Sequence, residues 1–293
     1  MENLGKIIYK IRTNKGLKQV DLSDTFLSPS HISQVEKGKK MLGGDKLLKI
    51  LVKTNTTFEE FTHLLGDEHI QNKISLEHRL SEYCKRQNLK GLKSLVKEAD
   101  TLYLKFNDFF FDHIRLMSLA MIELLENDYD YEKAKKYLDP IKNYLKEVSD
   151  IGEWGIYELS LISNCLFMFE IDTAIAFGEN ALKIFRKNYS QYKNQKLCCV
   201  LLSNLATYAL DYEKYYHLAL QYSLENISLS STQNDASNAI SSKIAYQLAC
   251  FKMGNGLFDK TTLIKLIETY KILEWHEKHR RILLFVKKHG IVL

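Results

Sequence analysis

The feature that most constrains the fold is a repeat of about 40 residues that covers most of the chain. Similar helix starts recur at Leu89, Tyr131, Ile171, Tyr212 and Leu257. A period near this length that holds two helices is typical of a solenoid of stacked helical hairpins. An irregular helical bundle, whose segments resemble one another by chance, is the alternative interpretation.

The composition favours an all-α fold. Only 2 of the 293 residues are proline. Proline breaks helix interiors and is common in the turns of β-rich folds, so its scarcity favours helices joined by short connections. We therefore predict an all-α protein whose larger part is a helical-repeat solenoid.

The first 66 residues do not follow the repeat and predict five short helices. Ser28 and Pro29 mark the start of the third, because serine caps free helix N–H groups and proline fits the first helical position. Gly38 ends this helix. A polar stretch follows the head and predicts a linker. The expected organisation is a helical head at 1–66, a linker at 67–73 and a helical-repeat domain at 74–293.

The positive charge of the chain is concentrated in this head. The formal net charge is +5, and residues 1–65 carry +4 of it. A small basic head on a nearly neutral body indicates a polyanionic partner.

Two stretches of the head resemble the helix-turn-helix of the Xre/Cro class. The first reads Leu-Lys-Gln-Val-Asp-Leu-Ser at 17–23, and the second reads Ser-Pro-Ser-His-Ile-Ser-Gln-Val-Glu-Lys-Gly at 28–38. In this class the second stretch is the recognition helix, which presents side chains to the major groove.

The whole chain resembles the Rgg family of Gram-positive bacterial regulators. The similarity lies in Leu4-Gly5, in Phe-Glu-Glu-Phe at 58–61 and in the stretch 154–169, which opens Trp-Gly-Ile-Tyr-Glu-Leu. It implies that 1–66 is a helix-turn-helix DNA-binding domain and that 74–293 is a tetratricopeptide-like repeat domain for peptide sensing and dimerisation. It also implies a homodimer that binds promoter DNA, with a short intracellular peptide pheromone as the ligand of the repeat domain.

A recognition helix places its N-terminal side chains against base edges, and nearby basic or amide groups contact phosphates. Gln34 can bind adenine through two hydrogen bonds. A dimer predicts an inverted-repeat site with half-sites about 34 Å apart. A solvated helix face is the alternative role of each residue. The predicted base-reading residues are Ser30, His31, Ser33 and Gln34, and the predicted phosphate contacts are Arg12, Lys18, Gln19, Lys37 and Lys39.

Stacked hairpins leave a concave face that is lined by the first helix of each unit. We expect these helices at 109–127, 154–169, 196–210 and 237–253. An amide matches the donor and acceptor of a peptide bond, and aromatic side chains can form pockets. The alternative is that the amides bond neighbouring helices and the aromatics fill the core. The predicted peptide-binding residues are Arg115, Asn164, Phe167, Asn204, Tyr208, Lys243 and Tyr246.

The sequence carries none of the common enzyme motifs, such as the P-loop, the nucleophile elbow or the His-Glu-x-x-His zinc motif. His276 and His279 lie three apart with Glu274 and Glu277 beside them, but a solvated helix face explains this pattern better than a metal site. We expect no enzymatic activity, no cofactor and no metal.

Five cysteines in an odd count, without C-x-x-C spacing, favour free thiols in a reducing compartment. Lys6 and Lys10 interrupt the first apolar positions, which argues against a secretion signal. There is also no run of about 18 apolar residues. The expectation is a cytoplasmic protein with no membrane partner.

Three points stay open at this level. The repeats could form a protein-binding scaffold with an inert head, or the chain could be a DNA-binding regulator without a peptide ligand. The apolar residues at 283–286 and 291–293 predict either a dimer surface or the core of the last repeat.

Overall fold

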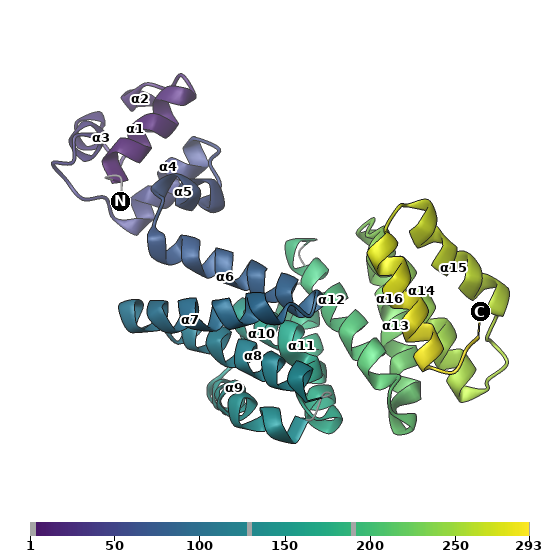
Figure 1. The fold of residues 1–293 in the computed structure, drawn as a ribbon. Helices are drawn as coiled ribbons and strands as arrows, with labels where there is room; N and C mark the ends of the chain where they lie inside the picture. Colours follow the sequence, from purple (N-terminus) through teal and green to yellow (C-terminus); the bar gives the residue numbers. More distant parts are fainter. Residues whose placement is uncertain (1–3, 128–130, 189–191, 293) are drawn as a thin grey trace. The chain divides into compact units, whose positions relative to one another are not determined.

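The computed structural model describes residues 4–127, 131–188 and 192–292. Every regular element in these ranges is a helix, apart from one isolated β-bridge between Asp24 and Leu27. The chain divides into two compact units, Met1–Arg115 and Leu116–Leu293, whose elements are labelled in Figure 1. The prediction of an all-α fold is confirmed.

The first unit opens with the five predicted helices of the head. They pack around two apolar clusters that both include residues of α1: Ile8 packs with Leu22 and Ile32, and Ile7 packs with Phe61. The α2–α3 pair forms the predicted helix-turn-helix. The five helices are α1 (Leu4–Asn14), α2 (Gln19–Leu22), α3 (Pro29–Glu36), α4 (Gly44–Lys53) and α5 (Phe58–Leu65).

The backbone of α1 comes very close to the end of α3 at Gly5. A Cβ atom at this position would lie 1.9 Å from the carbonyl oxygen of Val35, which is a backbone atom that cannot move aside cheaply. Glycine is therefore required here so that α1 can pack against α3.

The rest of the first unit consists of α6 (Glu68–Lys85), α7 (Leu89–Phe106) and the start of α8 (Phe109–Glu126). Asp67 caps α6 by accepting a hydrogen bond from the Ile70 N–H at 3.1 Å. The stretch 67–73 is therefore mostly helical, because a capping residue directly follows the left-handed Gly66 that ends α5. A domain boundary at this stretch stays a prediction.

The second unit contains the remainder of α8 and the later repeats. Successive helices from α10 to α16 pack against each other, and α12 packs against both α10 and α14. The first helices of successive repeats thus form one layer, as in a solenoid. The elements are α9 (Tyr131–Ile151), α10 (Ile156–Cys165), η1 (Leu166–Met168), α11 (Ile171–Asn188), α12 (Tyr192–Ala209), η2 (Glu213–Tyr215), α13 (Tyr216–Thr232), α14 (Ala236–Met253), α15 (Lys260–Ile272) and α16 (His276–Lys288).

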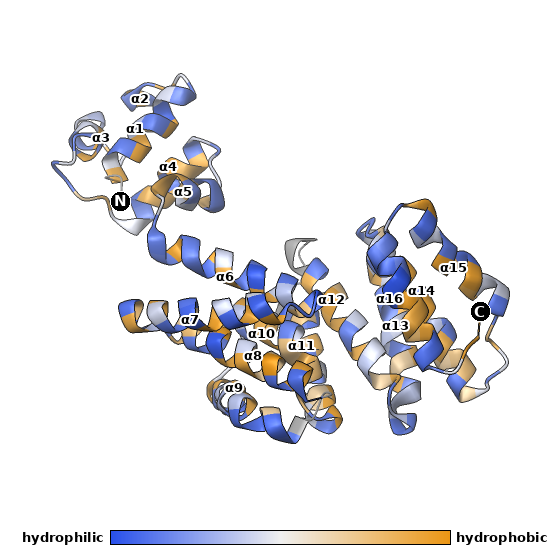
Figure 2. Cartoon of the chain, in the orientation of Figure 1, coloured by the Kyte–Doolittle hydropathy of each residue, from blue (hydrophilic) through white to orange (hydrophobic). Residues whose placement is uncertain are grey.

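The predicted period is visible in these bounds. Helices α7, α9 and α11 begin at Leu89, Tyr131 and Ile171, and Tyr212 directly precedes η2. Leu257 lies in the connection before α15. Figure 2 shows that the helices carry both hydrophobic and hydrophilic residues, as expected for helices that bury one side.

Side-chain hydrogen bonds between residues about 40 apart connect one repeat to the next. The Asn204 amide donates to the Ser163 carbonyl oxygen at 2.8 Å, and the Tyr208 hydroxyl donates to the Phe169 carbonyl oxygen at 2.7 Å. The first bond fixes α12 to α10, and the second fixes α12 to the residue that follows η1. The side chains of Asn204 and Tyr208 therefore have defined positions.

Candidate DNA interface and peptide pocket

The start of α3 is set by its local sequence. The Ser28 side chain accepts a hydrogen bond from the His31 N–H at 3.2 Å, and Pro29 occupies the first helical position. Ile32 and Val35 are almost fully buried in the head. Because these two residues anchor one side of the helix, the opposite side is left toward solvent.

That outer side carries the predicted base-reading residues. Ser30 is exposed, while His31, Ser33 and Gln34 are half-buried. Ser30, Ser33 and Gln34 are three and four residues apart, so their side chains neighbour one another on the helix surface. The Nε2 atom of His31 is enclosed, which makes this residue less available to a base than its neighbours.

A buried polar cluster fixes α3 to α1 and α2. The carboxylate of Glu36, at the end of α3, accepts bonds from Nε and Nη2 of Arg12 at 2.6 and 2.9 Å. It also accepts a bond from the amide nitrogen of Gln19 at 2.7 Å. The third Arg12 bond, from Nη1, goes to the Leu17 carbonyl oxygen at 2.7 Å. One carboxylate thus connects three helices.

This cluster corrects the expectation that Arg12 contacts a phosphate. Arg12 is only 7% exposed, and its guanidinium is bonded to Glu36 and Leu17. The hydrogen bond to Glu36 raises the pKa of Arg12 although burial opposes this change. The amide nitrogen of Gln19 is also used inside the head. The importance of Glu36 was missed, because the sequence does not show which cation it meets.

The three predicted phosphate-binding lysines are all exposed. Lys18 is the N-cap of α2, where its N–H donates to the Asp21 carboxylate at 2.7 Å. Lys37 directly follows α3, and the N–H of Lys39 donates to the Gln34 carbonyl oxygen at 2.8 Å. Two of the three lysines therefore lie just beyond the C-terminal end of the candidate recognition helix.

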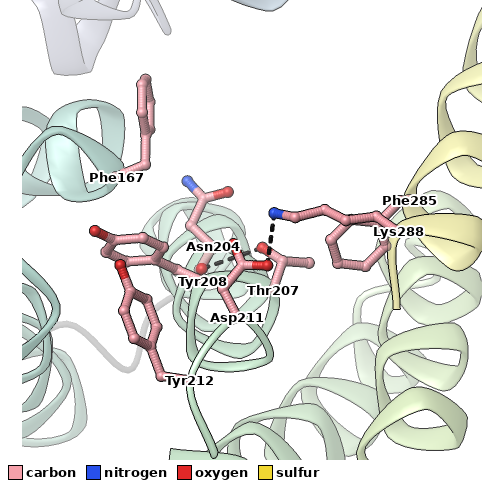
Figure 3. Close-up of a pocket in the computed structure, with 8 residues that line it drawn as sticks. All are labelled: Phe167, Asn204, Thr207, Tyr208, Asp211, Tyr212, Phe285 and Lys288. Atoms are coloured by element: carbon pink, nitrogen blue, oxygen red, sulfur yellow. Dashed lines mark hydrogen bonds and ion pairs between the residues drawn. The ribbon is translucent and has the colours of Figure 1, made fainter. Parts of the chain in front are cut away.

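The second unit contains a pocket of about 690 Å³ beside α12 and α16. Figure 3 shows Asn204 and Thr207 of α12 and Asp211 of the turn after it, with Phe285 and Lys288 of α16 opposite them. Three predicted peptide-binding residues line this pocket: Phe167, Asn204 and Tyr208. The structure adds five that were not predicted: Thr207, Asp211, Tyr212, Phe285 and Lys288.

Two of the predicted residues also have structural roles. Asn204 and Tyr208 each donate to a backbone carbonyl of the preceding repeat. The sequence left open whether such residues contact a peptide or bond a neighbouring helix. Asn204 and Tyr208 bond the preceding repeat and also line the pocket. Their bonds hold the wall of the pocket in place.

The other predicted peptide-binding residues are not part of this lining. Asn164 donates to Ser160 of its own helix at 3.5 Å. Lys243 is exposed on α14, and a bond with Cys250 raises the pKa of Tyr246. Arg115 belongs to the first unit, where it pairs with Asp112 at 2.6 Å.

Among the described residues, no group of three His, Cys, Asp or Glu side chains is placed to hold a metal ion, and this includes the neighbourhood of His276 and His279. None of the described helices is long and apolar enough to cross a bilayer.

Two family models match the chain. The model of the C-terminal domain of the HTH-type transcriptional regulator Rgg matches residues 112–282. A helix-turn-helix model matches residues 8–61, a range that contains α2, α3 and the cluster around Glu36.

Solved structures share the fold over almost the full length. A cysteine-to-serine variant of the SHP pheromone receptor Rgg2 of Streptococcus dysgalactiae is 21% identical, with a TM-score of 0.77 over 98% of this chain and 99% of that one. A protein of Listeria monocytogenes EGD-e is 20% identical, with a TM-score of 0.78 over 99% of each chain. Bacillus thuringiensis PlcR, solved with the peptide PapR7 and DNA, is 18% identical, with a TM-score of 0.65 over 96% of this chain and 99% of that one.

Proposed function

The chain belongs to the Rgg family of HTH-type transcriptional regulators, and from this premise we propose that it reads promoter DNA with α3 as a homodimer under the control of a short peptide. The observation that supports DNA binding is the solvent-facing side of α3. The hydrogen bonds from Arg12 of α1 and Gln19 of α2 to Glu36 fix the orientation of this helix. As a regulator of bacterial promoters it would act in the cytoplasm.

In this proposal the outer side chains of α3 contact base edges. Gln34 binds adenine through its amide, and Ser30 and Ser33 reach neighbouring acceptors. His31 takes part after its ring turns outward. Lys18, Lys37 and Lys39 contact phosphates on either side, and Gln19 contributes through its backbone N–H at the start of α2.

We expect Lys37→Ala and Lys39→Ala each to weaken binding to all duplexes alike. Each true phosphate contact releases about 0.9 counterion, so the slope of log K against log salt should fall by about 0.9 for each variant. A salt titration of full-length protein on a duplex of random sequence measures this. Lys183→Ala, which removes a charge from the second unit, is the matched control. An unchanged slope for both head variants would remove these lysines from the interface.

The small size of the head supports the homodimer. One such head buries little surface on DNA, so tight binding needs two heads on a twofold site. Exposed apolar residues are available near the C-terminus, where Leu284 is 62% exposed and Val292 is 81% exposed. We propose this region as the dimer surface, which sedimentation of the full-length protein would test.

The peptide part is supported by the pocket beside α12. Its volume of about 690 Å³ is in the range of sites that enclose small ligands, roughly 300–1,000 Å³. Aromatic walls and one amide are the groups that such a site needs for a peptide. Among the two amides considered from sequence, we propose that Asn204 rather than Asn164 contacts the ligand.

We expect Asn204→Ala to reduce peptide capture about tenfold, because a ligand amide would lose its partner in the pocket. The probe is a pool of random-sequence octapeptides, and the readout is mass spectrometry of the peptides retained by full-length protein. Asn164→Ala removes the same side chain one repeat earlier and should have no effect. Equal losses in the two variants would point to a general loss of structure.

The other two functions considered predict different results. A regulator without a peptide ligand would bind duplex DNA and capture no octapeptide from the pool. A scaffold with an inert head would be indifferent to duplexes even in dilute salt.

A further inference from the structure

The C-terminal helix supplies a cation to the pocket. The Nζ atom of Lys288 on α16 lies 2.6 Å from the carboxylate of Asp211, in the turn that follows α12, as the dashed line in Figure 3 marks. The side chain of Lys288 is 59% exposed and that of Asp211 is 26% exposed. The cation is therefore the more accessible partner of this pair.

The surroundings of the pair are biased toward positive charge. His289 is buried, and its Nε2 lies 3.7 Å from the same Asp211 carboxylate. Burial lowers the pKa of His289, the neighbouring Lys252 and Lys288 lower it further, and Asp211 opposes them. Two lysines and one carboxylate thus act on His289, and of the two lysines Lys288 is the one paired with Asp211. A ligand ammonium would have to displace Lys288 from Asp211, whereas a ligand anion adds to the existing pair.

We propose that Lys288 binds the free C-terminal carboxylate of a short peptide, with the last peptide side chain, an apolar one, between Phe167, Tyr212 and Phe285. This inference rests on the proposed peptide ligand. It assigns the C-terminus of that peptide to Lys288 of α16.

The geometry of the pocket supports a peptide whose C-terminus lies at Lys288. A lysine ammonium has three donors, so it can keep Asp211 and still bind a carboxylate. Asn204 and Thr207 lie three residues apart on one side of α12, and Asp211 lies in the turn that follows this helix. The peptide backbone would run along this line from the Asn204 amide to Lys288, which makes α16 part of the binding site.

The test uses a pool of random octapeptides in which every sequence is present both as the free acid and as the C-terminal amide. Full-length protein retains peptides from this pool, and mass spectrometry gives the acid-to-amide ratio. We expect free acids to be enriched about tenfold, because a charge-assisted hydrogen bond is lost on amidation. Lys288→Met should return the ratio to one.

Two further variants make the result specific. Lys243→Met removes a lysine of α14 that is not part of the pocket lining and should keep the preference for acids. Lys288→Arg retains the positive charge and should keep it as well, which excludes a loss caused by misfolding.

The outcomes separate the two proposals. If wild-type protein retains no peptide, the peptide ligand itself is wrong. If it retains acids and amides equally, or acidic side chains whether or not the end is amidated, the peptide ligand stands and the carboxylate assignment is wrong. A preference that survives Lys288→Met would place the carboxylate elsewhere.

Discussion

Glu36→Ala should destabilise the head by about 3–5 kcal/mol, because it leaves the buried guanidinium of Arg12 without its carboxylate. The side chains of Arg12 and Glu36 are only 9% and 5% exposed, so water cannot replace the lost partner. The Gln19 amide loses its acceptor at the same time. Hydrogen exchange of the amides in α1–α3, measured on the full-length protein, should lose roughly hundredfold protection or more.

Two variants show whether the effect comes from this pair. Glu60→Ala removes an exposed carboxylate from α5 and should leave the exchange rates unchanged. The double variant Arg12→Met with Glu36→Leu removes both charges and should recover much of the protection, since an apolar pair of similar volume is tolerated in such sites. Protection in Glu36→Ala equal to that of the wild type would contradict the role given to the cluster.

Gln34→Ala should lose about 1–3 kcal/mol of binding to a selected operator, roughly 5- to 150-fold, and almost nothing on random duplexes. The reason is that an amide bound to one base carries sequence information, while phosphate contacts do not. Competition binding with operator and random duplexes at one salt concentration measures the two affinities together.

The matched control for Gln34 is Lys39→Ala, which changes a neighbouring exposed residue. This variant should weaken both kinds of duplex by the same factor and leave their ratio unchanged. If Gln34→Ala behaved in the same way, the residue would be a backbone contact and the base-reading face of α3 would have to be reassigned.

The fold was largely predictable because its determinants are local. Ser28 and Pro29 start α3 through capping and a fixed backbone angle, and both effects act within one helical turn. The repeat starts at Leu89, Tyr131 and Ile171 were visible because each unit reuses the same pattern of packing.

The sites were less predictable because their geometry depends on residues far apart in the chain. Arg12 and Glu36 are 24 residues apart, and sequence alone does not tell whether Arg12 meets a phosphate or a carboxylate. Asn164 and Asn204 hold the same place in consecutive repeats, yet only Asn204 is in the lining of the pocket described. Lys288 and Phe285 reach it from α16, a helix whose position depends on the packing of the last repeats.

The central claim is that the two heads of a homodimer each contact base edges through α3. Selection of bound sequences from a pool of random duplexes tests this claim most directly. Full-length protein should enrich an inverted repeat whose half-sites are centred about 34 Å apart, or a multiple of this, and Gln34→Ala should relax one base position in each half. Enrichment of no sequence, or of the same sequence by wild-type protein and Gln34→Ala without any relaxed position, would contradict it.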